Sequence, residues 1–378
     1  MIRMIDDSLQ ASALVDWMAA VIGGDVPAWP VERAASSARI LAVADREGVI
    51  ALLHERLREP AFAGIVPADF RDQLAVAARV KTVQSLVRER RCRVVLTALR
   101  AAQLPTLLLK GSALAYWAYP SAAMRECSDI DLLLRSREDT DRAMGLLAML
   151  GYTPREEALP GDLVTFEHCC MPPPGNLAEP EIDLHWRLSG TPAFAFRFDW
   201  DELHSRAIAL PALASDALGL APVHAFIHAC MHRMQNKSDG PADTLKWLFD
   251  LIVLARGFRD EDWNALLDLA VARGLAGTCM DGIEAASGRF GEIAPTSILS
   301  ALAAAARDEI MDVQRMHEWR YVQRMSFLAF PTLRMRLRWL RQRLLPNPRY
   351  LRERHGSRGG FAGAIVARVR AVAERLRS

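Results

Sequence analysis

The sequence predicts an α+β protein in which a small strand-and-helix core lies between helical N-terminal and C-terminal regions. Three observations predict this class. Apolar residues recur at helical spacing before residue 78, strand-like and helix-like segments alternate between residues 106 and 150, and helical patterns return after residue 200. We therefore expect four parts: a helical region at 1–78, the core at 79–200, a helical domain at 201–330, and an arginine-rich segment at 331–378.

The composition is that of an ordinary globular protein and places no extreme constraint on function. The chain has 378 residues, a length that is enough for two or three domains. Of these residues, 51% are hydrophobic and 24% are charged. Its six cysteines show no CxxC spacing, so we expect reduced thiols and a cytoplasmic location. The acidic start has no signal-peptide pattern, and no apolar run approaches the ~20 residues of a membrane-spanning helix.

The region before the core is expected to consist of helices without catalytic residues. Residues 8–78 show helical spacing, and residues 80–102 predict a long basic amphipathic helix that Leu104 and Pro105 bring to an end. The arginines of this helix are interpreted as a solvated face. A single histidine, His54, is interpreted as a surface or packing residue.

The stretch from Pro105 to Leu134 organises the core. It predicts a strand at 106–109, a helix at 112–119 that a Gly-Ser turn opens, a loop, and a second strand at 128–134. A helix at 137–150 follows, with Gly151 at its C-terminal cap. The free N–H groups of a turn such as Gly111-Ser112 favour a phosphate.

Two aspartates in the second strand predict a cation site. Asp129 and Asp131 are two residues apart, so on a strand they point to one face while Ile130 points into a core. Adjacent carboxylates repel each other, and a divalent cation is the usual reason for such a pair. A phosphate-binding turn beside these carboxylates would suit chemistry at a nucleotide phosphate.

A third acidic strand is expected further along the chain. Residues 162–170 predict a strand, the proline-containing stretch 171–180 predicts a loop, and 181–186 alternates between polar and apolar residues. Glu181, Asp183 and His185 would therefore share one face of the last strand. This face could meet the Asp129–Asp131 pair across a sheet.

After Trp200 the strand signals stop, and we expect helices at 223–256, 262–273 and 295–327. His224, His228 and His232 are four residues apart and form one stripe of the first of these helices. The stripe could hold a structural zinc, but it lacks a clear helper ligand, so packing or lining of a substrate pocket is the favoured interpretation.

The C-terminal segment carries most of the positive charge. Residues 331–378 contain thirteen arginines and two glutamates, with apolar residues such as Leu337, Trp339 and Leu340 among the arginines. This pattern predicts either a packed helix with a solvated basic face or a surface for an anionic partner such as a membrane. Nucleic acid is the weaker candidate, because no aromatic stacking platform accompanies the arginines.

The ordered set of motifs LLLKGSALAYWAYP, SDIDLLL and EIDLHWRL resembles the uncharacterised nucleotidyltransferase family of the polymerase-beta-like superfamily. The resemblance extends over about residues 95–255 and includes a downstream helical stretch with His228, His232, Trp247 and Asp250. It implies a small mixed sheet flanked by helices, with a nucleoside triphosphate at the Gly-Ser turn.

The resemblance also implies roles for individual residues. Asp129, Asp131 and Asp183 would be catalytic and would hold two Mg²⁺ ions, and Asp183 would ease deprotonation of the attacking hydroxyl. A nucleoside triphosphate, with ATP as the expected one, would be bound by the residues Lys110, Gly111, Ser112 and Arg125. Candidate contributors to a substrate pocket are His185, His228 and His232.

Plainer interpretations of the same residues stay open at this point. Asp129 could cap a turn, Asp183 could pair with Arg125, Glu181 could be the third ligand, and Lys110 could be a solvated residue at a strand end. The resemblance favours an Mg²⁺-dependent nucleotidyltransferase that releases pyrophosphate and acts on an unidentified small-molecule, sugar or peptide acceptor. Phosphoryl transfer from ATP and a non-catalytic nucleotide-binding module are the alternatives.

Overall fold

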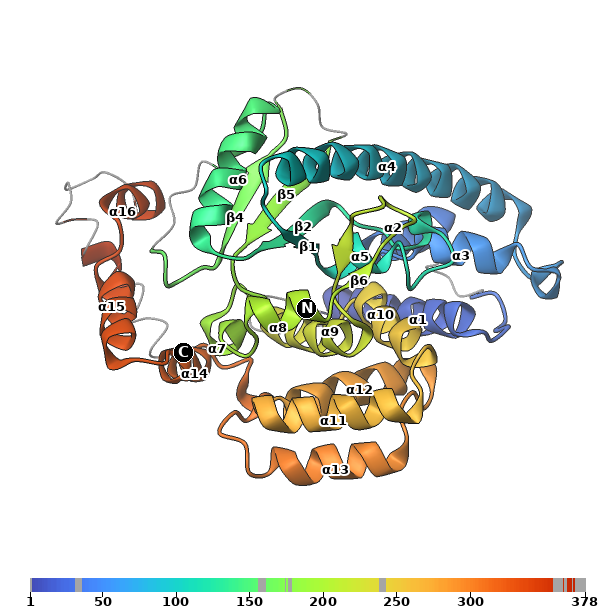
Figure 1. Cartoon of the computed structure of the whole chain (residues 1–378). Helices are drawn as coiled ribbons and strands as arrows, with labels where there is room; N and C mark the ends of the chain where they lie inside the picture. The colour runs from blue at the N-terminus through green and yellow to red at the C-terminus, as the bar shows by residue number, and fades with distance from the viewer. Residues whose placement is uncertain are drawn as a thin grey trace.

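The computed structural model describes residues 2–30, 36–155, 161–173, 175, 179–237, 243–355, 363, 366–368 and 370. Within these residues the chain is a mixed sheet surrounded by helices, which confirms the α+β class (Figure 1). Four residues of the loop expected at 171–180, at positions 174 and 176–178, and the arginines at 358, 375 and 377, lie outside the described residues.

The N-terminal region is helical, as predicted. Its helices are α1 (Ile2–Gly23), α2 (Ser37–Glu47), α3 (Ile50–Leu57) and α4 (Ala68–Ala101). Helix α2 begins at Ser36, whose side chain accepts a hydrogen bond from the Arg39 N–H, and it ends at Gly48, which takes a φ of 68°. The 34-residue α4 starts well before residue 80, so one continuous helix crosses the expected boundary at 78–79.

Among the described residues, seven strands form one mixed sheet in the order β3-β4-β5-β2-β1-β7-β6. The central pair, β2 and β5, is parallel, and β1 and β4 flank it as antiparallel neighbours. The strands are β1 (Thr106–Leu108), β2 (Asp129–Leu134), β3 (Thr153–Pro154), β4 (Glu167–Met171), β5 (Glu181–His185), β6 (Ile208–Ala209) and β7 (Leu218–Gly219).

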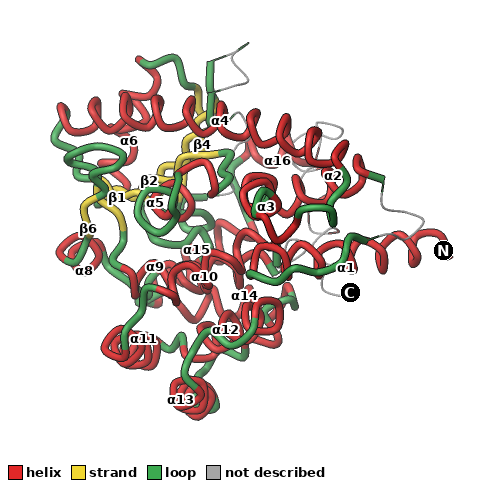
Figure 2. Tube along the Cα trace, turned by 90° about the vertical axis from the view of Figure 1, so that its right-hand side faces the viewer, coloured by secondary structure: helices red, strands yellow, loops and turns green. Residues whose placement is uncertain are grey.

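The two faces of the sheet differ in character. Helices α4 and α6 (Arg137–Met149) cover one face, where Ile130, Leu132 and Ile182 are fully buried with side chains of both helices (Figure 2). The alternation of the strand sequences predicted this apolar face. The opposite face, towards α9 (Pro222–Asn236), carries the acidic side chains.

Three expectations for the core are wrong in detail. Residues 162–164 form a turn, so β4 begins only at Glu167. Helix α5 (Lys110–Leu114) starts two residues earlier than expected, which places Gly111 and Ser112 inside its first turn. Strands β6 and β7 lie in the region predicted to be all-helical, and β7 adds to the sheet as a parallel neighbour of β1.

The helices after the core form a second layer beneath the sheet (Figures 1 and 2). The stretch expected to be helical at 223–256 comprises α9 and α10 (Leu245–Arg256), and that at 295–327 comprises α13 and α14. The other elements of this part are α7 (Pro192–Ala195), α8 (Trp200–Ser205), α11 (Asp260–Arg273), α12 (Ala276–Phe290), α13 (Thr296–Ala306) and α14 (Trp319–Ala329). One hydrophobic core contains side chains of α1–α4 together with those of α9–α12. The four-part division of the chain stays a prediction.

The chain continues into α15 (Leu333–Leu344) and α16 (Pro348–His355) at the side of the molecule (Figure 1). Trp339 of α15 is buried in a small cluster with Leu163, Phe166 and Phe330. Among the described residues, no helix is long and apolar enough to cross a membrane.

Candidate active site

The acidic residues of β2 and β5 lie side by side because the two strands are parallel and in register. Asp131 is the register partner of Asp183, and Asp129 is the partner of Glu181. Side chains at register positions of neighbouring strands project from the same face. The structure therefore brings Asp129, Asp131 and Asp183 to one face, as the alternation predicted.

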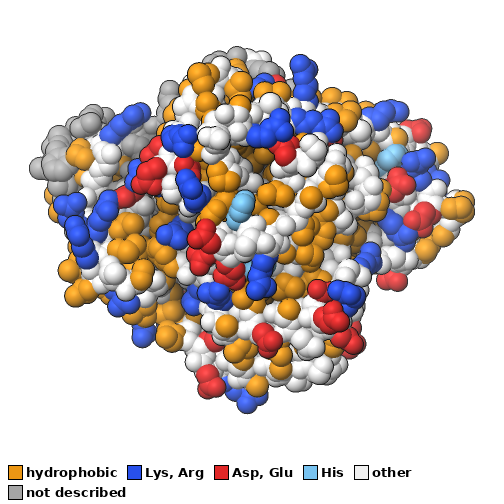
Figure 3. Space-filling model, in the orientation of Figure 1, with side chains coloured by type: hydrophobic (Ala, Val, Ile, Leu, Met, Phe, Trp, Pro, Cys, Tyr) orange, Lys and Arg blue, Asp and Glu red, His pale blue; other side chains and the backbone are white. Residues whose placement is uncertain are grey.

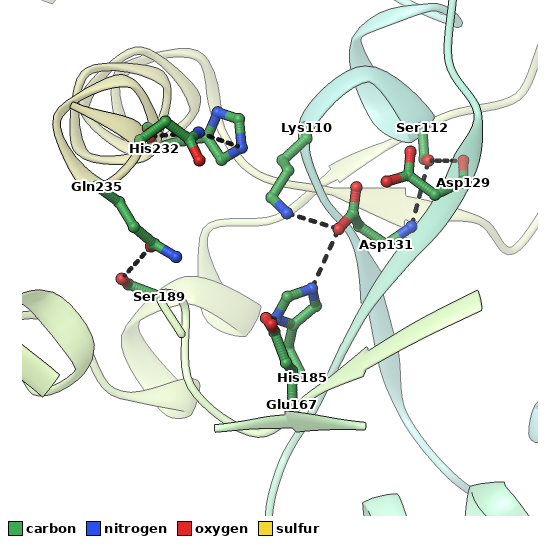
Figure 4. Close-up of polar contacts among 10 residues, drawn as sticks. Lys110, Ser112, Asp129, Asp131, Glu167, His185, Ser189, His232 and Gln235 are labelled. Carbon is green, nitrogen blue, oxygen red and sulfur yellow. Dashed lines mark hydrogen bonds and ion pairs between the residues drawn. The ribbon is translucent and has the colours of Figure 1, made fainter. Parts of the chain in front are cut away.

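Asp131 is the electrostatic centre of this face (Figure 4). Its Oδ1 accepts hydrogen bonds from Lys110 Nζ at 2.7 Å and contacts His185 Nε2 at 3.1 Å, and its side chain is 3% exposed. Burial alone would raise the pKa of Asp131, but the charges of Lys110 and His185 outweigh burial and hold that pKa well below its usual range. Asp131 is therefore a carboxylate throughout the physiological pH range.

Lys110 is aimed at Asp131 by an uncommon backbone conformation. Its φ of 49° lies in the left-handed region, which residues other than glycine rarely adopt. This conformation turns the chain from β1 into α5. The ammonium group then extends from the end of β1 into the space between Asp131 and His232 of α9 (Figure 4).

His185 lies between Asp131 and Glu167, a residue that was not predicted to be in the site. His185 Nδ1 lies 3.1 Å from Glu167 Oε2 of β4, while its Nε2 faces Asp131. Burial lowers the pKa of His185, but the two carboxylates outweigh burial and raise this pKa to about 9. Glu167 is the register partner of His185. The strand expected at 162–170 was the signal that could have placed Glu167 on a strand, but its pairing with β5 is not visible in the local sequence.

Asp183 and Asp129 lack comparable cationic partners. Asp183 Oδ1 is buried and has no hydrogen-bond partner among the described residues. Burial and the charge of Asp131 raise the pKa of Asp183, and the same two causes raise that of Asp129 to about 6. A buried oxygen without a partner and neighbouring carboxylates fit a divalent cation, which would satisfy the oxygen and lower the repulsion.

Within the described residues, one group of metal-ligating atoms is compact enough to surround an ion. It consists of Asp131, Asp183 and His185, whose ligand atoms lie within 4.8 Å of one another. Asp129 is outside this group, although it lies on the same strand face. Glu181 pairs instead with Arg155 at 2.7 Å, and its side chain is 38% exposed.

Gly111 and Ser112 hold the first turn of α5 tightly against the start of β2. The buried Ser112 hydroxyl donates to the Asp129 carbonyl at 3.1 Å and accepts from the Asp131 N–H at 3.3 Å. A Cβ at Gly111 would collide with Cys127 Sγ and would lie 2.9 Å from Arg125 Cζ. Only glycine therefore fits between α5 and the segment 125–128.

Arg125 is bound to α10 and does not pair with Asp183. Its Nε and one terminal nitrogen each donate to a carboxylate oxygen of Asp250 at 2.7 Å, and its other terminal nitrogen donates to the Glu126 carbonyl. Tyr119 donates to the same carboxylate at 2.7 Å. These buried contacts hold the segment before β2 against the helical layer.

A cavity of about 180 Å³ opens beside these residues. Most of the predicted nucleotide-binding and pocket residues line it, together with members of α10 that were not predicted to be in the site. Its lining includes Lys110, Gly111, Arg125, Asp129, Asp131, His228, His232, Lys246, Trp247 and Asp250. The predicted residues Ser112, Asp183 and His185 do not line this cavity. Each of them lies next to Asp131, which does.

The histidines of α9 are uncharged pocket and packing residues. Burial and the charge of Lys110 lower the pKa of His228 to about 3 and that of His232 well below its usual value. His232 also meets the edge of the Trp247 ring at 5.0 Å. His224 points elsewhere and lies 3.4 Å from Glu202, so the three histidines do not converge on a zinc.

A family profile decides how this geometry is classified. The profile of the uncharacterised nucleotidyltransferase family matches residues 34–291, well over half of the chain. The chain belongs to the uncharacterised nucleotidyltransferase family. This membership confirms the resemblance carried by the KGS, DID and EIDLHW motifs, and the matched range includes every site residue described above.

The nucleotidyltransferase profile ends before α13, so the arginine-rich helix α15 lies outside the matched range. A search of curated proteins found no match to the chain, and a search of solved structures found none either. The family supports a transferase that acts with a nucleotide.

Proposed function

We propose that this protein transfers a nucleoside monophosphate from a nucleoside triphosphate, with ATP as the first candidate, to a hydroxyl group of a small-molecule, sugar or peptide acceptor. One observation carries the proposal. Asp131 and Asp183 are register partners on adjacent parallel strands, and the buried Oδ1 of Asp183 has no partner among the described residues.

The donor set suits two Mg²⁺ ions held by Asp129, Asp131 and Asp183. Hard cations prefer carboxylate oxygens, and the nearby His185 would keep its contact with Asp131. When bound, such ions neutralise phosphate charge and stabilise the charge that develops during displacement at phosphorus. Asp183 is preferred over Glu181 because Glu181 is already paired with Arg155.

The chain's own residues would position the reactants. Lys110 is placed to bind a phosphate oxygen at the mouth of the cavity while it remains in contact with Asp131. The first turn of α5 offers the backbone N–H groups of Gly111 and Ser112, whereas the Ser112 hydroxyl is occupied by β2. Arg125 would have a structural role: its hydrogen bonds to Asp250 hold two lining residues of the cavity in place.

Asp183 is the residue proposed to accept the proton of the attacking hydroxyl. Its Oδ1 has no partner among the described residues, whereas Asp131 is already engaged by Lys110 and His185. The uncharged His228 and His232 would line the cavity beside the nucleotide without adding charge to it. We propose a cytoplasmic location, since all six cysteines are free thiols.

Product analysis tests this proposal. The protein is incubated with each of the four nucleoside triphosphates and Mg²⁺, with water or candidate alcohols as the acceptor, and pyrophosphate and nucleoside diphosphate are measured separately. Pyrophosphate release that disappears in the Asp129→Ala/Asp131→Ala double variant supports nucleotidyl transfer. Diphosphate release would instead indicate phosphoryl transfer, and nucleotide binding without any product would indicate a non-catalytic module.

A further inference from the structure

Helix α15 presents two faces of opposite character. On one face, Met335, Trp339 and Gln342 dock the helix onto the protein: Trp339 is 4% exposed, and Gln342 accepts a hydrogen bond from the Leu163 N–H at 3.0 Å. These residues are four and three apart and therefore share one helical stripe. Because this face packs against the protein, the opposite face of α15 is exposed to solvent.

The outward face carries a stripe of leucines. Leu333, Leu337, Leu340 and Leu344 are 66%, 56%, 39% and 57% exposed, which is unusual for four leucines on one face of a folded helix. Their spacing of four, three and four residues places them in one row. The part of the chain that the structure describes therefore leaves this apolar row of α15 exposed.

Arginines border this leucine row. Arg334, Arg338 and Arg341 each follow a stripe leucine by one position and are exposed. Residues 319–352 contain no aspartate or glutamate, and α14, which packs beside α15, adds the exposed Arg320 and Arg324. Figure 3 shows Lys and Arg side chains gathered on the left of this view, over α15, with hydrophobic side chains between them.

We propose that α15 is a docking surface for a membrane that contains anionic phospholipids. A basic helix with an apolar row lies in the plane of the lipid–water interface, where leucines enter the acyl boundary and arginines meet phosphates. Nucleic acid would engage the arginines and leave the leucines uncovered. A second copy of the chain would bring two arginine-rich faces together, which repel each other. The proposal does not depend on the activity of the site.

Vesicle co-sedimentation of the full-length protein tests this surface. Vesicles of phosphatidylcholine with about 30% phosphatidylglycerol are compared with pure phosphatidylcholine at about 0.1 M and about 0.5 M salt. Binding is expected with the anionic vesicles and to be weaker at high salt. The Leu337→Ser/Leu340→Ser variant should bind about tenfold less. The Arg334→Gln/Arg341→Gln variant should lose about fivefold for each arginine.

The matched control replaces two exposed apolar side chains elsewhere on the protein. Val83 and Leu86 on α4 are each 60% exposed, so Val83→Ser/Leu86→Ser should bind the anionic vesicles like the unchanged protein. Thermal melts of all variants check that the fold is kept. The proposal is wrong if the unchanged protein does not bind anionic vesicles, if the leucine variant binds equally well, or if the α4 control loses as much binding.

Discussion

Asp131 and Asp183 face each other across the parallel pair β2–β5, yet their surroundings are opposite. Asp131 contacts two cationic groups, Lys110 and His185, whereas Asp183 Oδ1 is buried without a partner among the described residues. The pKa of the first is consequently lowered and that of the second is raised. Two carboxylates with divergent proton affinities can serve different purposes in one reaction.

The first prediction concerns the contribution of His185 to stability in the metal-free protein. The folded-state pKa of His185 is about 9 and its unfolded value is about 6.5, so the charged form is favoured by folding. The stabilisation is complete below pH about 6.5 and is lost as the pH rises through about 9, in total on the order of 3 kcal/mol.

Urea unfolding in EDTA at several pH values between these limits measures this effect. The unchanged protein should lose unfolding free energy across the window, and His185→Gln should show a flatter dependence because it cannot bind the proton. Equal slopes for the two proteins would mean that the Asp131–His185–Glu167 contacts do not hold a charged imidazole.

A second prediction assigns His185 a positioning role in the reaction. Because its imidazole holds Asp131 from the side of β4, His185→Gln should lower pyrophosphate release roughly 10–100-fold. The matched control is His168→Gln, a histidine of the same sheet that contacts the exposed Asp141 instead. Loss of activity in both variants, or in neither, would contradict this role.

A third prediction follows from the packing of Gly111. Gly111→Ala should lower the free energy of unfolding by about 1–3 kcal/mol, since its methyl group would collide with Cys127 and Arg125. Gly145→Ala is the control: this exposed glycine of α6 has nothing within 4 Å of an added Cβ and should stabilise by about 0.5–1 kcal/mol. Denaturant titrations of both variants measure the difference.

A double variant isolates the contact between Gly111 and Cys127. Replacing Cys127 with alanine removes one of the two colliding groups, so Gly111→Ala/Cys127→Ala should recover part of the loss caused by Gly111→Ala. If the two substitutions are strictly additive, Gly111 is required for a reason other than its contact with Cys127.

A fourth prediction concerns the ion pair between Arg125 and Asp250. Both side chains are almost completely buried, so Asp250→Asn leaves a buried charge without its partner and should destabilise the protein by about 3–5 kcal/mol. The exposed pair of Arg259 and Glu261 provides a control, and Glu261→Gln should change the unfolding free energy by less than about 0.5 kcal/mol. Similar effects for the two variants would contradict the importance of the buried pair.

Much of the acidic face could be predicted from the sequence because strand alternation is local. The spacing of Asp129, Asp131, Asp183 and His185 fixes which side chains share a face, and the structure agrees. The order of the strands is not local. Strands β6 and β7 have two residues each, too few to show a period, and their pairing depends on where β1 lies.

The contacts that support the site residues could not be predicted for a similar reason. Arg125 and Asp250 are separated by 125 residues, and no sequence pattern in either segment predicts that their side chains form an ion pair. The positive φ of Lys110 could not be predicted from the sequence either, because lysine has no preference for the left-handed conformation. The tight connection between β1 and α5 imposes this conformation. Both features are set by tertiary packing and not by local sequence.

The central claim is that the carboxylates of Asp131 and Asp183 together hold a divalent cation. Calorimetric titration with Mn²⁺, in place of Mg²⁺, tests this directly in the unchanged protein, in Asp183→Asn and in Glu181→Gln. We predict that the unchanged protein and Glu181→Gln bind alike, because Glu181 is occupied by Arg155, and that Asp183→Asn binds at least roughly tenfold more weakly. Equal Mn²⁺ affinity in Asp183→Asn and the unchanged protein would contradict the account.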